Sequence, residues 1–144
     1  MAPVDILFIA GFGPIVRTPD SRRLYGDVLG VGFKEEQGGY LHTEAIDGAK
    51  TFALWPLNQA AQSCFGVEAW PDDIPAPQAW IEFDVEDVEA ATAQAEAAGY
   101  RLLVKCKTEP WGQMVSRFLS PEGLLVGLTY TPSFRGAALP AGIA

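Results

Sequence analysis

The order of the elements that the sequence predicts is its most constraining feature, because the same order occurs twice. A strand, a helix and three further strands are predicted over residues 4–57 and again over residues 78–131. Both predicted helices end at a glycine, Gly30 in the first half and Gly99 in the second, where a left-handed residue can close a helix. We therefore expect one α+β domain over residues 1–144, made of two βαβββ modules.

The first module begins with a strand and a capped helix. The strand signal runs from Ile6 to Val16, and the glycines and Pro14 within it predict a bulge or bend instead of a regular central strand. Thr18 is suited to cap the helix that follows, and Pro19 is suited to its first turn. Three short strands are then expected over residues 32–35, 40–46 and 51–57.

The modules are joined by residues 58–77, which lack apolar periodicity and are rich in proline, and we interpret this segment as a linker. Residues 132–144 are rich in alanine, glycine and proline. We expect them to form a tail that is mobile or lies along a partner subunit. The second module is predicted to contain a helix over 86–98 and strands over 79–85, 101–105, 113–119 and 124–129.

Charge and cysteine content exclude several classes of protein. The net charge of −8 argues against nucleic acid as a partner, since few cations could neutralise the phosphates. No apolar run approaches the ~20 residues that cross a membrane, and the N-terminus does not read as a signal peptide. Cys64 and Cys106 are far apart and lack metal-ligand spacing, so we expect free thiols in a reducing cytoplasm.

Several motifs follow one another in a specific order. The first runs from Arg17 to Gly30 and is similar to the pattern D-x-x-x-S-x-x-F-Y-x-x-x-L-G, and Ser120 to Gly123 is similar to a D-P-D-G turn. Further matches lie over residues 85–91, 97–100 and 109–113. Together these motifs resemble the vicinal oxygen chelate superfamily, which includes glyoxalases, bleomycin-resistance proteins and extradiol dioxygenases. The resemblance covers residues 6–132 and implies curved mixed sheets of the glyoxalase/bleomycin-resistance fold.

Enzymes of this superfamily bind a divalent metal through His, Gln or Glu side chains on four strands. The resemblance places these positions at Ala10, near Ala53, at Trp80 and at Gly127, and none of these side chains can bind a metal. The chain also has a single histidine, His42, and no cluster of acidic residues at ligand spacing. We therefore expect no metal, no other cofactor and no catalytic residues of the kind that the superfamily uses.

A metal-free member of this fold would still have a concave sheet that can bind a ligand between aromatic walls. Trp80 would stand at a vacated metal position, and Trp55 lies two residues from Ala53 on the same face of its strand. Trp111 belongs to a Pro-Trp-Gly turn that overhangs the binding groove in drug-binding relatives. For all three tryptophans, packing in the core is the alternative to contact with a ligand.

Polar candidates accompany the tryptophans. Glu82 shares a strand face with Trp80 and Asp84. Each carboxylate is either a ligand anchor or, as we favour, the partner of Arg117 or Arg17. The remaining candidates for ligand contact are His42, Glu44 on the same strand face, and Phe12 on the first strand.

Two functions of different class follow. The first is a metal-independent binding protein of the bleomycin-resistance type, a homodimer that sequesters an aromatic or amphipathic natural product in a tryptophan-lined groove. The alternative is a glyoxalase- or dioxygenase-like enzyme with an atypical or absent metal site, in which Glu82 or His42 supplies acid–base chemistry. A structural or protein-interaction role is a third interpretation, since this fold hosts many functions.

Overall fold

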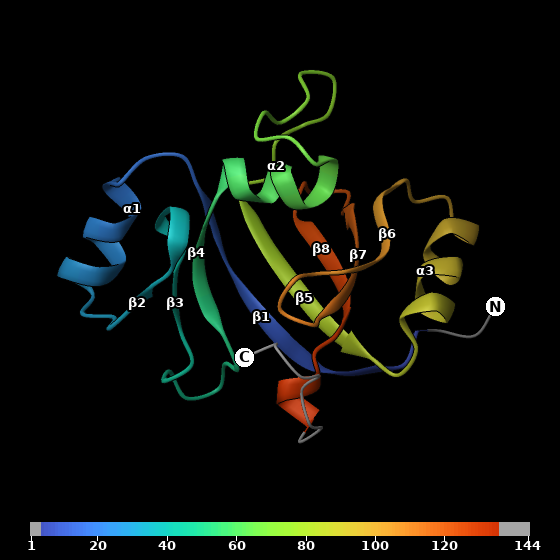
Figure 1. Ribbon diagram of the computed structural model, residues 1–144, viewed down its shortest axis with the longest axis horizontal. Coiled ribbons are helices and arrows are strands. Elements are labelled where there is room, and N and C mark those ends of the chain that lie inside the picture. Colours follow the sequence, from blue (N-terminus) through green and yellow to red (C-terminus); the bar gives the residue numbers. More distant parts are fainter. Residues whose placement is uncertain (1–3, 136–144) are drawn as a thin grey trace.

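The computed structural model describes residues 4–135, which form one eight-stranded sheet with helices packed against it. The strands lie in the order β2-β3-β4-β1-β5-β8-β7-β6, and the sheet is curved and not closed into a barrel (Figure 1). The predicted α+β class and both βαβββ modules are confirmed. Within residues 4–135, no helix is long and apolar enough to cross a membrane.

The helix of the first module begins where the sequence predicts. The Thr18 hydroxyl accepts a hydrogen bond from the Asp20 backbone N–H at 3.3 Å, and α1 (Asp20–Arg22) continues as a π-helix over Arg23–Val28. Gly30 then adopts a left-handed φ of 78°, as expected. The strands of this module are β1 (Ile6–Val16), β2 (Lys34–Glu35), β3 (Leu41–Thr43) and β4 (Phe52–Pro56).

The second module repeats this order. Asp87 caps α3 (Val88–Ala97) by accepting a hydrogen bond from the Ala90 N–H, and the sheet interrupts its regular pairing at Cys106, whose φ is 48°. The strands of this module are β5 (Ala79–Val85), β6 (Leu102–Thr108), β7 (Met114–Leu119) and β8 (Leu125–Tyr130).

The two modules are joined within one chain through β1 and β5, which pair antiparallel. Register shifts after Ile6 and Ile9 confirm the predicted irregularity of β1, although this strand lies at the centre of the sheet. Gly13 explains how β1 fits there. A Cβ atom at this position would lie 1.9 Å from the carbonyl oxygen of Ala53 on β4, so only a glycine permits the observed approach.

The segment predicted as a linker begins with a helix that the sequence analysis did not predict, α2 (Leu57–Phe65). Its buried residues are small, Ala60, Ala61, Ser63 and Cys64, and of these Ala60 and Cys64 pack into the core beside Trp55 and Trp80. Leu57, Ala60, Ala61, Cys64 and Phe65 do recur at helical spacing, but they were overlooked because prolines dominate the rest of the segment. In Figure 1, α2 lies across one end of the curved sheet, while α1 and α3 lie on either side.

The predicted tail is described only in part. Residues Pro132–Arg135 form a 3₁₀ helix, and residues 136–144 lie outside the described residues.

The close approach at Gly13 makes a testable prediction. Gly13→Ala should lower the free energy of unfolding by at least about 2 kcal/mol, because backbone atoms of β1 and β4 must move apart. Gly32→Ala is the matched control, since a Cβ there would meet no atom within 4 Å. Urea unfolding of both variants measures the difference, and equal stabilities would contradict the packing described here.

Candidate functional site

A contact between two distant strands shows which face of the sheet is concave. The Arg117 guanidinium carbon lies 4.7 Å from the centre of the Trp55 ring. β7 and β4, which carry these residues, are separated by β8, β5 and β1, so a flat sheet would hold them roughly 19 Å apart. The sheet therefore curves toward this face, which also carries Trp80 and Glu82 and which we call the inner face.

A buried ion pair lies at the centre of the inner face. The Arg117 side chain is 1% exposed, and its Nη1 donates to Glu82 Oε2 at 2.9 Å. The Arg117 Nε–H has no hydrogen-bond partner among the residues that the structure describes. The favoured interpretation of Glu82, an ion pair with Arg117, is confirmed.

Glu82 is also linked to the turn between β6 and β7. Gln113 Nε2 donates to Glu82 Oε1 at 3.0 Å and to the Thr131 hydroxyl at 3.0 Å. Trp111 Nε1 in turn donates to Gln113 Oε1 at 3.1 Å. A continuous chain of hydrogen bonds thus connects the half-exposed Trp111 ring with the buried Arg117–Glu82 pair.

Asp84 forms a second buried site on the same strand. Its carboxylate accepts hydrogen bonds from the hydroxyls of Thr129 and Thr131 and from the backbone N–H of Thr131. Its ion-pair partner is Arg135, at 3.0 Å, and not Arg117 or Arg17 as the sequence analysis proposed. Arg135 follows the last strand in the 3₁₀ helix, where no motif indicated that it would fold back onto β5.

Trp80 and Trp55 pack against each other in the core. Their ring centres are 5.9 Å apart in an edge-to-face arrangement, and the rings are 5% and 8% exposed. Trp80 Nε1 donates to the Ala53 carbonyl oxygen at 3.3 Å, so the indole also satisfies a buried polar group. In this structure both tryptophans are core residues, and their contact with a ligand stays a prediction.

The residues at the four family metal positions do not fit a metal ion. Ala10, Ala53, Trp80 and Gly127 carry no side-chain ligand atom suited to one. A Cβ at Gly127 would lie 2.9 Å from Glu82 Cγ and 3.4 Å from Arg117 Nη1, so the ion pair takes up that space. Across residues 4–135, no three His, Cys, Asp or Glu side chains come together as a metal site.

His42 is held between two carboxylates. Its Nδ1 lies 2.7 Å from Glu44 Oε2 and its Nε2 lies 3.0 Å from Glu36 Oε1. Burial lowers the pKa of His42, but hydrogen bonds to Glu44 and Glu36 outweigh it and raise the pKa above 6.5. Tyr40 stacks on the imidazole with ring centres 5.3 Å apart. Burial and the nearby Glu82 carboxylate raise the pKa of Tyr40 far above its usual value.

Phe12 is not part of this assembly. It pairs with Ile81 and Phe52, which point away from the inner face, and its ring lies 5.6 Å from the Phe52 ring. The structure thus gathers Trp55, Trp80 and Glu82 on the inner face and links Trp111 to them. Sequence reasoning missed Gln113, although its position within the Trp-Gly-Gln turn was a usable signal.

The comparisons with known proteins agree with this architecture. A family model described as Glyoxalase/Bleomycin resistance protein/Dioxygenase superfamily matches residues 16–128. The chain belongs to this superfamily. A comparison with curated protein sequences found no match.

Three solved structures illustrate how far the superfamily fold is shared. A superfamily member from Vibrio splendidus 12B01 is 16% identical, with 85% of this chain and 98% of that chain covered and a TM-score of 0.56. Methylmalonyl-CoA epimerase from Mycobacterium tuberculosis is 20% identical, with 95% and 97% covered and a TM-score of 0.55. A protein described as NAD-dependent benzaldehyde dehydrogenase from Legionella pneumophila is 13% identical, with 83% and 96% covered and a TM-score of 0.57. At these identities the likeness shows the fold alone.

The buried ion pair predicts a large effect on stability. Arg117→Met should lower the free energy of unfolding by about 3–5 kcal/mol, because it leaves the Glu82 carboxylate buried without its cation. Arg22→Gln breaks the exposed pair with Glu35 and should cost less than about 1 kcal/mol. Urea unfolding compares the two. Should Arg117→Met fail to fold, the double variant Glu82→Leu/Arg117→Met should fold, since no charge is then left unpaired.

His42 predicts a pH dependence with a defined sign. Because its pKa is raised in the folded state, the stabilisation it provides is complete below about pH 6.5 and is lost as the pH rises through the folded-state pKa. The stability difference between wild type and His42→Gln should therefore shrink above that pH. As the single histidine of the chain, His42 gives one imidazole signal in an NMR titration. A midpoint at or below 6.5 would contradict the arrangement with Glu36 and Glu44.

Proposed function

We propose that this protein is a metal-independent small-molecule binding protein of the bleomycin-resistance type, which sequesters an aromatic or amphipathic compound. One observation carries the proposal: the half-exposed Trp111 ring is coupled through Gln113 to the buried Arg117–Glu82 pair. A planar ligand can stack on Trp111 while its polar groups compete for the hydrogen bonds of Gln113. The bound compound would lie at the open side of the inner face.

The state of the acid–base groups favours binding over catalysis. The Glu82 carboxylate is occupied by Arg117 and Gln113, and both ring nitrogens of His42 contact carboxylates. Burial raises the pKa of Cys64 to about 11, so its thiol is protonated at neutral pH and is a poor nucleophile. An enzyme of the glyoxalase or dioxygenase kind is the alternative, and it would need to free one of these groups.

Ligand binding tests the proposal directly. We expect daunorubicin, used as a planar aromatic probe, to quench tryptophan fluorescence equally with and without EDTA. Trp111→Ala should weaken binding roughly 2- to 13-fold, the loss of one aromatic stacking contact. Tyr100→Ala is the matched control, because Tyr100 is also an exposed aromatic residue (41%) but its ring packs on Phe118 of β7.

Two results would overturn this function. Binding that requires added Zn²⁺ or Ni²⁺, or chemical turnover of a probe, would favour the enzyme. Equal affinities of Trp111→Ala and Tyr100→Ala would remove Trp111 from the site.

We further propose that the protein is a homodimer. Leu7 and Ile9 on β1 are each 46% exposed, which is an unusual amount of aliphatic surface for a central strand. Native mass spectrometry measures the subunit number, and a monomer at micromolar concentration would reject the dimer.

A further inference from the structure

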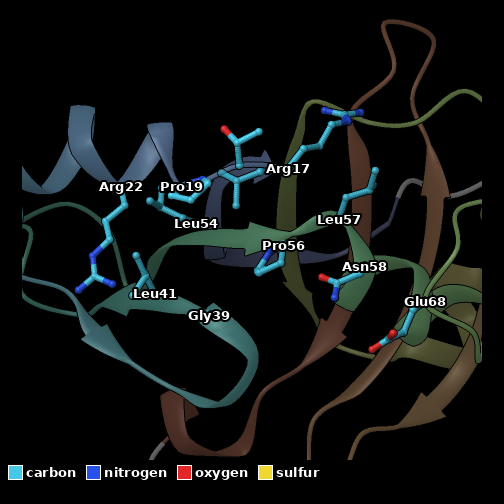
Figure 2. A pocket seen from close by; sticks show the side chains of 12 residues that line it. Arg17, Pro19, Arg22, Gly39, Leu41, Leu54, Pro56, Leu57, Asn58 and Glu68 are labelled. Atoms are coloured by element: carbon cyan, nitrogen blue, oxygen red, sulfur yellow. The ribbon is translucent and has the colours of Figure 1, made fainter.

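A cavity of about 520 Å³ lies outside the curved sheet, between the start of α1, the end of β4 and the first residues of α2 (Figure 2). Leu41, Leu54, Pro56 and Leu57 supply an apolar surface. The volume falls within the roughly 300–1,000 Å³ typical of small-molecule sites. None of the residues predicted to bind ligand lines this cavity, so it is independent of the function proposed above.

The charge of the cavity wall differs from that of the chain. Two arginines, Arg17 and Arg22, line the cavity together with one carboxylate, Glu68, whereas the chain as a whole carries −8. Arg22 and Glu68 lie at opposite ends, with Leu41, Leu54 and Pro56 between them (Figure 2). An anion at the Arg22 end would therefore be remote from Glu68, and the carboxylate it competes with there is Glu35, the partner of Arg22.

Arg22 retains the capacity to bind such an anion. Its Nη1 donates to Glu35 at 2.9 Å, which leaves most of the guanidinium N–H groups available. Both side chains of this pair are more than half exposed, so the interaction is weak and a ligand can compete with it. Arg17 has no ion-pair partner in residues 4–135 and adds positive potential beside the cavity.

We propose that this outer cavity binds a small organic carboxylate with an apolar body. The carboxylate is held at the Arg22 end by charge-assisted hydrogen bonds, and the apolar body covers Leu54 and Pro56. Apolar contact alone would not distinguish such a ligand from a neutral one, so the arginines set the specificity for an anion.

Titration with octanoate, 1-octanol and octylamine tests this site, with binding followed through backbone amide shifts in NMR. We expect octanoate to bind more tightly than both other probes and to shift Thr18, Gly39 and Leu54. Arg22→Gln should weaken octanoate binding roughly tenfold, as expected for loss of a charged hydrogen bond. Glu35→Gln should strengthen it, because Arg22 is then released from its internal partner.

Arg23→Gln is the matched control. Arg23 is the next residue along the helix, and its side chain does not line the cavity. The substitution removes the same charge as Arg22→Gln and should leave octanoate affinity unchanged. Equal affinity for octanoate and 1-octanol, equal effects of Arg22→Gln and Arg23→Gln, or shifts confined to the Trp111 turn would each overturn the proposal. Failure of octanoate to bind at all would do the same, while leaving the Trp111 site unaffected.

Discussion

The interior of this protein depends on one buried ion pair. Arg117 and Glu82 come from strands on either side of β8, and Gly127 lies between them on that strand with no side chain to keep them apart. Arg117, on β7, also lies against the ring of Trp55, on the distant strand β4. The ion pair therefore helps to hold the sheet in its curved form. Such a pair is costly to bury, and it is tolerated here because Gln113 and an aromatic face supply further interactions.

The same pair takes up the space at Gly127, one of the four family metal positions. The Glu82 side chain and the Arg117 guanidinium fill the space that a side chain at position 127 would occupy. The Trp80 indole lies over Gly11 and donates a hydrogen bond to the Ala53 carbonyl oxygen. Both carboxylate oxygens of Glu82 are engaged, Oε2 by Arg117 and Oε1 by Gln113. The charge that a bound cation would bring to this interior is supplied by the protein itself.

Much of the fold could be predicted because its signals are local. Thr18, Gly30 and Gly99 mark the ends of helices through their own backbone and side-chain preferences, and each acts as expected. The helix α2 escaped prediction because its short apolar stripe directly precedes a proline-rich stretch, and the whole segment was interpreted as a linker. The Asp84–Arg135 pair escaped because its members are far apart in sequence, and only the 3₁₀ helix after β8 brings them together.

The sequence predicts which residues form the candidate site better than it predicts what each residue does there. Alternation along β5 correctly placed Trp80, Glu82 and Asp84 on one face, since side chains of a strand alternate with a period of two. Alternation does not predict which of these side chains are exposed to solvent. Their exposure depends on how α2 and the side chains of β7 pack against the inner face. Phe12, named only as a candidate for ligand contact, lies on the other face because the register shift after Ile9 changes the direction in which the following residues point.

The open sheet leaves two edge strands, and both are built in ways that oppose pairing with another chain. β2 is two residues long and consists of Lys34 and Glu35, so it offers almost no backbone for a neighbouring strand. On β6, Cys106 interrupts the hydrogen-bonding pattern in a left-handed conformation and is flanked by Lys105 and Lys107. Pairing of the sheet with a second chain is the first step toward fibrillar aggregation. It is blocked at β2 by the shortness and charge of the strand, and at β6 by the flanking lysines and the left-handed backbone of Cys106.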